Sequence, residues 1–415
     1  MDTAQGGRAG RRMRAAAGGW LARANAERLR RLTRLSAWIV RLLAWREPAH
    51  QWLTTLRTLP ERSRAAFRLA YYVAPHALLR PARPALALSP TVRLIVNPAS
   101  GGVHGGVDLA LLRQTAVWLG EHGMPAEVCL TSGPGDATRL ASEAVSKHLD
   151  LVVAVGGDGT VNGVIQALAG HDTALGVLPM GTVNVWAREM GISMNVVEAR
   201  ELLLHGARRR VDLGRAGSRY FLLMAGVGFD AEVARRVDRG PLKRIGLKLL
   251  HYITTAGVLS VTQSPTRVRM RFNGKRRSYN ALMILIGNTR LYGGALSFTN
   301  RAVADDGLLD LVVVENGGLL YRLGVLGRAL LRRASLGPRV RYRQARAIRV
   351  DADEPLPVQV DGEVIGTLPM TFSVAAGALT VVVPRDAQPR LFQHAPLPNA
   401  TPRDLAGDMQ FGHRG

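Results

Sequence analysis

Short apolar runs alternate with helix-like stretches between residues 92 and 178. The runs at 92–96, 126–130, 151–155 and 175–178 have the length and the Val, Leu and Ile content of buried strands. Helix-like stretches lie between or after them, at 109–119, 137–147 and 161–168. Because alternation of strand and helix is typical of βαβ units, we expect an α/β domain with a parallel sheet over residues 91–212.

A different pattern begins near Val211, where strand-like segments follow one another closely. This close spacing of strand-like segments predicts a mostly antiparallel β-sandwich domain over residues 213–384, interrupted by one helical insert at 231–259. Residues 385–415 are polar and rich in proline, so we expect a loose tail. The strand-like segments lie at 220–224, 268–272, 281–286, 309–314, 347–350, 358–360, 370–374 and 379–383.

Residues 1–90 form a basic extension that ends in a proline-containing linker. They hold seventeen arginines against four acidic residues. Between residues 20 and 45, apolar residues recur at helical spacing with arginines between them, which predicts a basic amphipathic helix. Such a helix suits an anionic membrane surface, and a helix that covers the protein's own body explains the pattern equally well. A transit peptide is the less favoured alternative.

Charge and composition narrow the classes of partner. The net charge of +24 and the pI near 11.4 favour nucleic acid, anionic lipid or phosphorylated ligands, although coding bias toward arginine also explains part of the excess. Aromatic residues make up only 5% of the chain, which argues against a specific nucleic-acid binder. A single cysteine, Cys129, excludes a disulfide framework. No apolar run has the length of a membrane-spanning helix, so we expect a cytoplasmic protein that associates with the membrane peripherally.

The strongest chemical signal is the run from Gly156 to Asn162, where a buried strand leads through glycines into a helix. Glycines let the backbone approach a polyphosphate closely, and the start of a helix favours negative charge. Asp158 would repel such a ligand unless a cation such as Mg²⁺ lay between them. A tight turn capped by Asp158 and Thr160 is the simpler alternative, and it does not require so many glycines.

Two further loops of small residues, at 97–102 and 179–184, also follow predicted strands. Ligands of open parallel sheets bind at the carboxyl ends of the strands. The three loops together therefore predict one nucleotide-binding crevice.

These segments resemble the diacylglycerol kinase catalytic family, which includes sphingosine and ceramide kinases and bacterial lipid kinases. The resemblance rests on the three loops, in their order and spacing, and on the later segments 211–214, 225–231, 304–310 and 359–363. It covers roughly residues 92–384. It implies a nucleotide-binding domain similar to those of phosphofructokinase and NAD kinase, and transfer of the γ-phosphate of ATP, with Mg²⁺, to a hydroxyl group of a membrane lipid such as diacylglycerol. The implied nucleotide contacts are Asn97, Pro98, Ser100, Gly101, Thr131, Gly156, Gly157, Asp158, Gly159, Thr160, Val161, Asn162, Gly181, Thr182 and Asn184.

The resemblance also implies catalytic and metal-binding roles. Glu363 would be the general base that takes the proton of the lipid hydroxyl, with Asp158 as the second catalytic carboxylate. Asp306 would bind a structural Mg²⁺ together with the backbone oxygens of Val303 and Leu308. Without the resemblance, both segments would be interpreted as ordinary turns between strands.

Three positions depart from the family pattern. Gly102 stands where many members have Lys, Gly163 where Glu is common, and Val185 where bacterial diacylglycerol kinases have Asp. These departures leave open a nucleotide-binding, membrane-associated regulatory protein with weakened catalysis, and a kinase of a soluble substrate, similar to NAD kinases, is a further alternative. The sequence does not fix the oligomeric state, and a homodimer is one arrangement that it allows.

Overall fold

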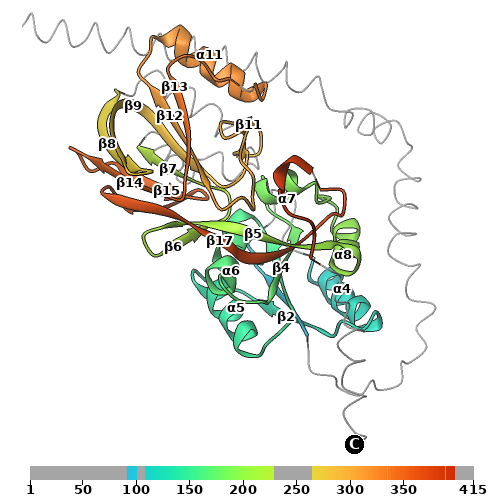
Figure 1. Ribbon diagram of the computed structural model, residues 1–415. Helices are drawn as coiled ribbons and strands as arrows, with labels where there is room; N and C mark the ends of the chain where they lie inside the picture. Colours follow the sequence, from blue (N-terminus) through green and yellow to red (C-terminus); the bar gives the residue numbers. More distant parts are fainter. Residues whose placement is uncertain (1–90, 101–107, 229–263, 334, 388, 398–415) are drawn as a thin grey trace, which may run out of the picture. The chain divides into compact units, whose positions relative to one another are not determined.

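The computed structural model describes residues 91–100, 108–228, 264–333, 335–387 and 389–397 (Figure 1). Predictions for the basic extension 1–90, for the helical insert 231–259 and for the tail beyond residue 397 lie outside these residues. Gly101 and Gly102 also lie outside them. Ser89–Gly415 form one structural unit, which is the unit considered below.

Four parallel strands form the first part of the sheet, as the alternating pattern predicts. They lie in the order β4-β3-β1-β2, and their shared direction brings all four carboxyl ends to one edge. Helices surround these strands, with α5 and α6 close together (Figure 1). The strands are β1 (Val92–Val96), β2 (Ala126–Leu130), β3 (Leu151–Gly156) and β4 (Ala174–Pro179), and the helices are α4 (Leu109–Glu121), α5 (Asp136–Ser146), α6 (Asp158–Leu168) and α8 (Val196–His205).

The later strands are mostly antiparallel and continue the same sheet, which confirms the predicted fold class. β17 (Met370–Val383) joins the two parts, because it pairs in parallel with β4 and antiparallel with β5 (Ala207–Ala216). The sequence pattern predicts two strands here, whereas β17 is one strand with a register shift between Ala375 and Leu379.

The remaining elements lie mostly in the β-rich part. The strands are β6 (Arg219–Phe221), β7 (Met224–Gly228), β8 (Thr266–Phe272), β9 (Lys275–Gly287), β10 (Leu291–Tyr292), β11 (Leu296–Ser297), β12 (Leu309–Glu315), β13 (Val340–Ala345), β14 (Ala347–Ala352), β15 (Pro357–Val360) and β16 (Glu363–Thr367). The helices are α7 (Val185–Met190), α11 (Leu319–Leu330) and the short η3 (Pro389–Leu391). In Figure 1, α11 lies at the opposite end of the unit from α4 and α5.

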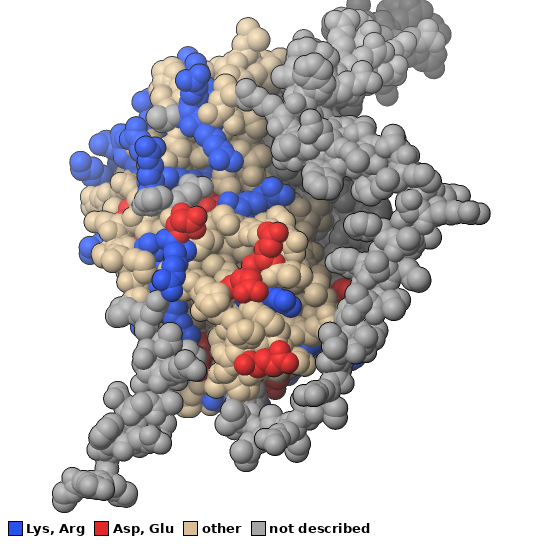
Figure 2. Space-filling model, turned by 90° about the vertical axis from the view of Figure 1, so that its right-hand side faces the viewer, with Lys and Arg blue, Asp and Glu red and all other residues tan. Residues whose placement is uncertain are grey.

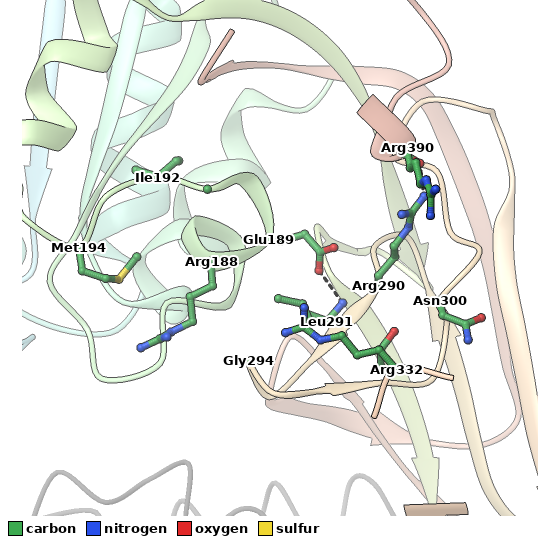
Figure 3. A pocket seen from close by; sticks show the side chains of 12 residues that line it. Arg188, Glu189, Ile192, Met194, Arg290, Leu291, Gly294, Asn300, Arg332 and Arg390 are labelled. Carbon is green, nitrogen blue, oxygen red and sulfur yellow. Dashed lines mark hydrogen bonds between the residues drawn. The ribbon is translucent and has the colours of Figure 1, made fainter. Parts of the chain in front are cut away.

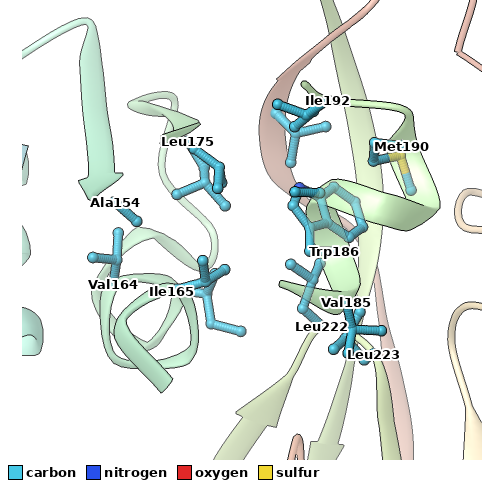
Figure 4. Close-up of a cluster of buried hydrophobic side chains, with 14 of the residues drawn as sticks. Ala154, Val164, Ile165, Leu175, Val185, Trp186, Met190, Ile192, Leu222 and Leu223 are labelled. Atoms are coloured by element: carbon cyan, nitrogen blue, oxygen red, sulfur yellow. The ribbon is translucent and has the colours of Figure 1, made fainter. Parts of the chain in front are cut away.

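Two hydrophobic clusters stabilise these parts. The larger cluster includes the inner strands of the parallel sheet, which are buried on both faces and are therefore apolar throughout. It extends to α7, where Trp186 is 1% exposed and lies in one cluster with Leu222 and Leu223 (Figure 4). The second cluster lies in the antiparallel part, where β8 alternates buried apolar residues with exposed arginines, as expected for a strand with one solvated face.

None of the helices in the described residues is long and apolar enough to cross a bilayer. The surface is basic in places. On the face in Figure 2, many Lys and Arg side chains gather toward the top of the view, and acidic side chains are fewer. Peripheral association remains a prediction.

Candidate active site

The turn from β3 into α6 is the centre of the candidate site. β3 ends at Gly156, Gly157 is extended, and α6 begins with the next residue. A Cβ atom on Gly156 would lie 2.4 Å from Oγ1 of Thr160 and 3.1 Å from Oγ of Ser100. Only glycine therefore lets the chain pass between these two hydroxyl groups. The first turn of α6 begins here, and the N–H groups of a first helical turn are suited to bind anions.

The loop after β1 closes one side of this turn. The N–H of Asn97 donates to the carbonyl of Val155 over 3.0 Å, which continues the pairing of β1 with β3. Its side-chain Nδ2 lies 3.5 Å from Oγ1 of Thr160. Asn97 thus holds the first loop beside α6. Pro98, next in this loop, is exposed.

The loop after β4 closes another side, and two glycines make the contact. A Cβ atom on Gly181 would lie 2.5 Å from the Cα atom of Gly157, so position 181 has no room for a side chain, and a Cβ atom on Gly157 would make a tight contact of 3.3 Å with the Cα atom of Gly181. Asn184 closes the loop on itself, since its Oδ1 accepts the N–H of Gly181 and its Nδ2 donates to the carbonyl of Gly181. Thr182 lies half-buried within it. Three loops far apart in sequence therefore meet, as the sequence predicts.

Asp158 lies at the start of α6 and faces α7. Its Oδ1 accepts the N–H of Trp186 over 3.4 Å. In the same first turn Gly159 is exposed and Val161 is buried, so the turn is open on one side only. This arrangement leaves a half-buried carboxylate beside the glycine turn, which is the position that the sequence predicts for a metal-linked acid.

Thr131 lies at the end of β2, where its N–H donates to the carbonyl of Val96. The loop after it is shaped by Asp136, whose carboxylate accepts from the side chain and backbone of Ser132 and from the N–H of Gly133. These hydrogen bonds, first of all that of the Ser132 hydroxyl, lower the pKa of Asp136 to about 2. Sequence reasoning includes the segment but assigns no role to Asp136.

Asn162 points away from the three loops, toward the β-rich part. Its Nδ2 donates to a carboxylate oxygen of Asp361 over 2.9 Å, and its Oδ1 accepts from Nη2 of Arg219 over 3.0 Å. The same Nη2 atom donates to Oε2 of Glu363 over 2.6 Å. Glu363, which is 61% exposed, is thereby linked to the first turn of α6. The sequence places Asn162 among the nucleotide contacts, and its side chain here links α6 to the turn that holds Glu363.

Asp361 anchors that turn. Its carboxylate accepts the N–H groups of Leu222, Leu223 and Met224 at 2.8 to 3.0 Å, in addition to Asn162. Burial raises the pKa of Asp361, and these hydrogen bonds oppose the change. Asp361 is in the left-handed region with a φ of 47°, which a non-glycine residue adopts only when its surroundings hold it there. Sequence reasoning notes Asp361 in the motif and misses Arg219, because nothing distinguishes that residue among the many arginines of the chain.

The predicted metal turn holds Asp306 half-buried, with Oδ1 accepting the N–H of Leu308 over 2.9 Å. The neighbouring carboxylate of Asp212 accepts the N–H groups of Gly307 and Gly377. Burial raises the pKa of Asp306, and the nearby negative charges of Asp212 and Asp305 add to the effect. A cation would relieve this repulsion, so the chemistry of the turn fits a hard ion.

Among the described residues, no three His, Cys, Asp or Glu side chains lie together in a group that could hold a metal. The predicted set is of another kind, because two of its three ligands are the backbone oxygens of Val303 and Leu308. It therefore stays a prediction.

The two described departures from the family pattern have physical reasons. A Cβ atom on Gly163 would lie 2.9 Å from Cβ of Ala137, and the carbonyl of Gly163 accepts the hydroxyl of Thr138. Glutamate would therefore clash with α5 at this position. Val185 is buried in the larger cluster beside Trp186. Gly163 thus lets α6 pack closely against α5, and Val185 contributes to the packing of α7.

Comparisons with known proteins agree along most of the described chain. Residues 91–216 match the diacylglycerol kinase catalytic domain, and residues 224–383 match the YegS C-terminal NAD kinase beta sandwich-like domain. The diacylglycerol kinase of Bacillus subtilis (strain 168) is 30% identical over 302 residues, which cover 72% of this chain and 98% of that protein. The diacylglycerol kinase of Staphylococcus aureus (strain MRSA252) is 30% identical over 296 residues, covering 71% and 92%. A crystal structure of a diacylglycerol kinase from Bacillus anthracis str. Sterne matches with a TM-score of 0.56 at 26% identity, over 70% of this chain and 96% of that one.

Proposed function

Because the chain belongs to the diacylglycerol kinase family of lipid kinases, we propose that it transfers the γ-phosphate of ATP to a hydroxyl group of diacylglycerol or a related membrane lipid. One observation carries the proposal. The glycine turn at Gly156 and Gly157 meets two other loops, and Glu363 is tied through Arg219 to the helix that this turn begins. The proposed phosphate site and the proposed base are thus both connected to helix α6.

The nucleotide would be held by the loops at the carboxyl ends of β1, β3 and β4. Backbone N–H groups at the start of α6 suit its phosphates, and the hydroxyl groups of Ser100 and Thr160 lie beside them. Asp158, whose carboxylate lies at the start of α6, would help to bind Mg²⁺, which when bound would neutralise charge on the phosphate oxygens. We propose that Asp306, with the carbonyls of Val303 and Leu308, holds a second Mg²⁺ with a structural role.

Glu363 would act as the general base. Its carboxylate accepts the proton of the lipid hydroxyl while that oxygen forms a bond to the γ-phosphorus, and the bond from phosphorus to the leaving ADP oxygen breaks. Arg219 orients the carboxylate through the 2.6 Å contact and does not need to touch the substrate. Asp361 in turn fixes the backbone from which Glu363 projects.

The lipid acceptor requires contact with a bilayer. We propose that the enzyme associates peripherally with an anionic membrane surface, helped by the basic extension before residue 91 and by the net charge of +24. Attraction of this kind falls as salt is added, because exposed charges are screened. Sedimentation with anionic vesicles in low and high salt measures it directly.

The direct test is transfer of labelled phosphate from ATP to a lipid panel in mixed micelles with Mg²⁺. The panel holds diacylglycerol, monoacylglycerol, sphingosine, ceramide and polyprenol. We expect label on at least one lipid, and a loss of at least about a hundredfold in Glu363→Gln, since general-base catalysis contributes this much. The exposed Glu121 of α4 supplies the control, because Glu121→Gln should leave transfer unchanged.

A regulatory nucleotide-binding protein is the second candidate, and the buried Val185 favours it because an acidic residue is lost beside the nucleotide loops. The same experiment separates the two. Protein that binds ATP and labels no lipid in the panel would overturn the kinase proposal and favour the regulatory one.

A further inference from the structure

A pocket of about 610 Å³ lies beside α7, outside the three nucleotide loops. One wall carries Glu189 and Ile192 and the other carries Arg290, Arg332 and Arg390 (Figure 3). These residues come from α7 and the loop after it, from the segment before β10, from the end of α11 and from η3. We call it the arginine pocket. None of the predicted nucleotide contacts lines it.

The arginine pocket carries more positive charge than its surroundings satisfy. Arg188 at its rim donates from Nε to the carbonyl of Val183, and Arg290 donates from Nε to the carbonyl of Ala302. Arg332 and Arg390 are exposed, and within the described part of the chain neither guanidinium group makes a hydrogen bond or an ion pair. Two of the arginines that line the pocket therefore have donors without a partner among the described residues (Figure 3).

The acid in the pocket does not cancel this charge near neutral pH. Glu189 is 2% exposed and accepts the N–H of Leu291. Burial raises the pKa of Glu189 to about 7, while the Leu291 hydrogen bond and the charges of Arg290 and Arg332 act in the opposite direction. Near neutral pH the carboxyl group is therefore partly protonated, and the positive charges that act on it are those of Arg290 and Arg332.

The backbone at Arg332 adds an independent observation. Arg332 follows the end of α11 with a φ of 49°, in the left-handed region where helices usually place glycine or asparagine. A residue with a Cβ atom costs roughly 1 kcal/mol in this conformation. Arg332, which makes no hydrogen bond or ion pair within the described residues, thus lies at a position that its backbone disfavours, and strain of this kind is common at binding sites.

The arginine pocket also touches the third nucleotide loop. A Cβ atom on Gly294 would lie 2.8 Å from a methyl group of Val183, so the turn between β10 and β11 lies directly against that loop. Arg188 holds the carbonyl of the same residue. A ligand that bridges the two walls would therefore restrain this loop.

We propose that the arginine pocket is a binding site for a phosphate monoester, separate from the nucleotide crevice, in which Arg332 and Arg390 bind the phosphate oxygens. Guanidinium groups match phosphate with paired hydrogen bonds, and a pocket of this volume suits a small molecule or a lipid head group. The site goes beyond the proposed function and does not depend on it. Binding of phosphate needs no lipid acceptor, so absence of kinase activity would leave this proposal untouched.

The test titrates inorganic phosphate by calorimetry into the full chain, saturated with Mg²⁺ and a non-hydrolysable ATP analogue that fills the nucleotide crevice. We expect wild type to bind phosphate and the double variant Arg332→Gln with Arg390→Gln to bind it at least about tenfold more weakly, as for loss of charge-assisted bonds. The matched control is Arg271→Gln with Arg276→Gln. These exposed arginines face each other on β8 and β9 and, in the described chain, also lack an ion pair.

Three results would overturn the proposal. They are equal phosphate affinity in the pocket variant and in wild type, an equal loss in the control variant, and binding that occurs only without the ATP analogue. A variant with lysine at both positions keeps the charge and loses the paired geometry, so we expect an intermediate loss. Thermal unfolding of each variant checks that the fold is intact.

A second titration distinguishes the two sources of a phosphate monoester. Phosphatidic acid in nonionic mixed micelles is compared with phosphatidylcholine in the same micelles. Retention of phosphatidic acid that depends on Arg332 and Arg390 assigns the pocket to a lipid head group. Binding of inorganic phosphate alone, with the same dependence on the two arginines, assigns it to a soluble phosphate ester.

Discussion

The nucleotide crevice and the corner that holds Glu363 are built in opposite ways. The crevice is made of backbone and glycines, in three loops that each span only a few residues at the end of a strand. The Glu363 corner is made of side chains from distant segments, since Arg219 and Asp361 lie 57 and 199 positions after Asn162 in the sequence. The crevice needs small residues in short motifs, while the corner needs particular hydrogen bonds across the fold.

Because of this difference, we expect substitutions in the two regions to impair the protein in different ways. In the crevice a Cβ atom added at Gly156 or Gly181 would overlap atoms of a neighbouring loop or helix turn, so such substitutions should act through sterics and should affect stability and activity together. In the corner the geometry depends on a few polar contacts, so substitutions should divide into those that loosen the turn and those that misplace the base. The predictions below test this division, from the largest expected effect to the smallest.

Gly181→Ala should have the largest effect. Its Cβ atom would lie 2.5 Å from the Cα atom of Gly157, and neither backbone can move without shifting a nucleotide loop. We expect a loss of stability of about 3 kcal/mol, the upper range for overpacking, and at least about a hundredfold loss of phosphoryl transfer, as misplaced reacting groups cause. Denaturant unfolding and the labelled-phosphate assay measure the two effects.

Gly120→Ala in α4 is the matched control for that substitution. Nothing lies within 4 Å of its added Cβ atom, and the residue lies in the last turn of a helix. It should stabilise the protein by roughly 0.5–1 kcal/mol. If Gly181→Ala were as stable and active as Gly120→Ala, the crevice would not depend on the contact between the two glycines.

Asp361→Asn should have the next largest effect, and it acts on the corner. The carboxylate accepts three backbone N–H groups and Asn162, whereas an amide offers one oxygen and brings two donors. We expect a loss of stability of about 2 to 3 kcal/mol, because buried donors lose their acceptor. Urea unfolding measures it. Asp172→Asn, at a fully exposed site, should change stability by less than about 0.5 kcal/mol.

Glu189→Gln should change how stability depends on pH. The pKa of Glu189 is raised from 4.5 in the unfolded chain to about 7 in the folded protein. The contribution of this carboxyl group to stability is therefore fully present below the pKa of the unfolded chain, and it is lost as the pH rises through the pKa of the folded protein. Glutamine does not titrate, so the variant should gain roughly 2 kcal/mol over wild type between about pH 5.5 and pH 8. Denaturant unfolding at both values measures this. If the free energies of unfolding of the two proteins differed by the same amount at both pH values, the Glu189 carboxyl group would not titrate in this range.

Much of the fold could be predicted because its signals are local. The continuous apolar runs of β1 and β3, buried on both faces, and the glycines at Gly156 and Gly157 predict strand, turn and helix without knowledge of tertiary contacts. The long strand β17 could not be predicted. Its register shift between Ala375 and Leu379 interrupts the apolar pattern, and only pairing with β5 shows one strand.

The site divides in the same way. The three loops follow from short motifs, and the structure brings their described parts together. Arg219 could not be predicted, because its role depends on two acceptors that are 57 and 144 residues away. The bonding of Asn162 to Asp361 is likewise a property of the folded chain. The roles of Glu363 and Asp306 rest on the family resemblance and stay predictions.

Arg219→Gln gives the smallest and most specific of the expected effects. Arg219 is 33% exposed and links Glu363 to Asn162 without being placed on the substrate, so it is a positioning residue. We expect kcat for lipid phosphorylation to fall roughly tenfold, equivalent to about 1.4 kcal/mol, while KM for ATP stays unchanged. Arg219→Lys keeps one charged donor and should recover part of the loss, and Arg215→Gln, which changes an exposed residue of the neighbouring strand β5, should have no effect. A rise in KM for ATP with constant kcat would instead place Arg219 in nucleotide binding, and the contrast between the crevice and the corner would no longer hold.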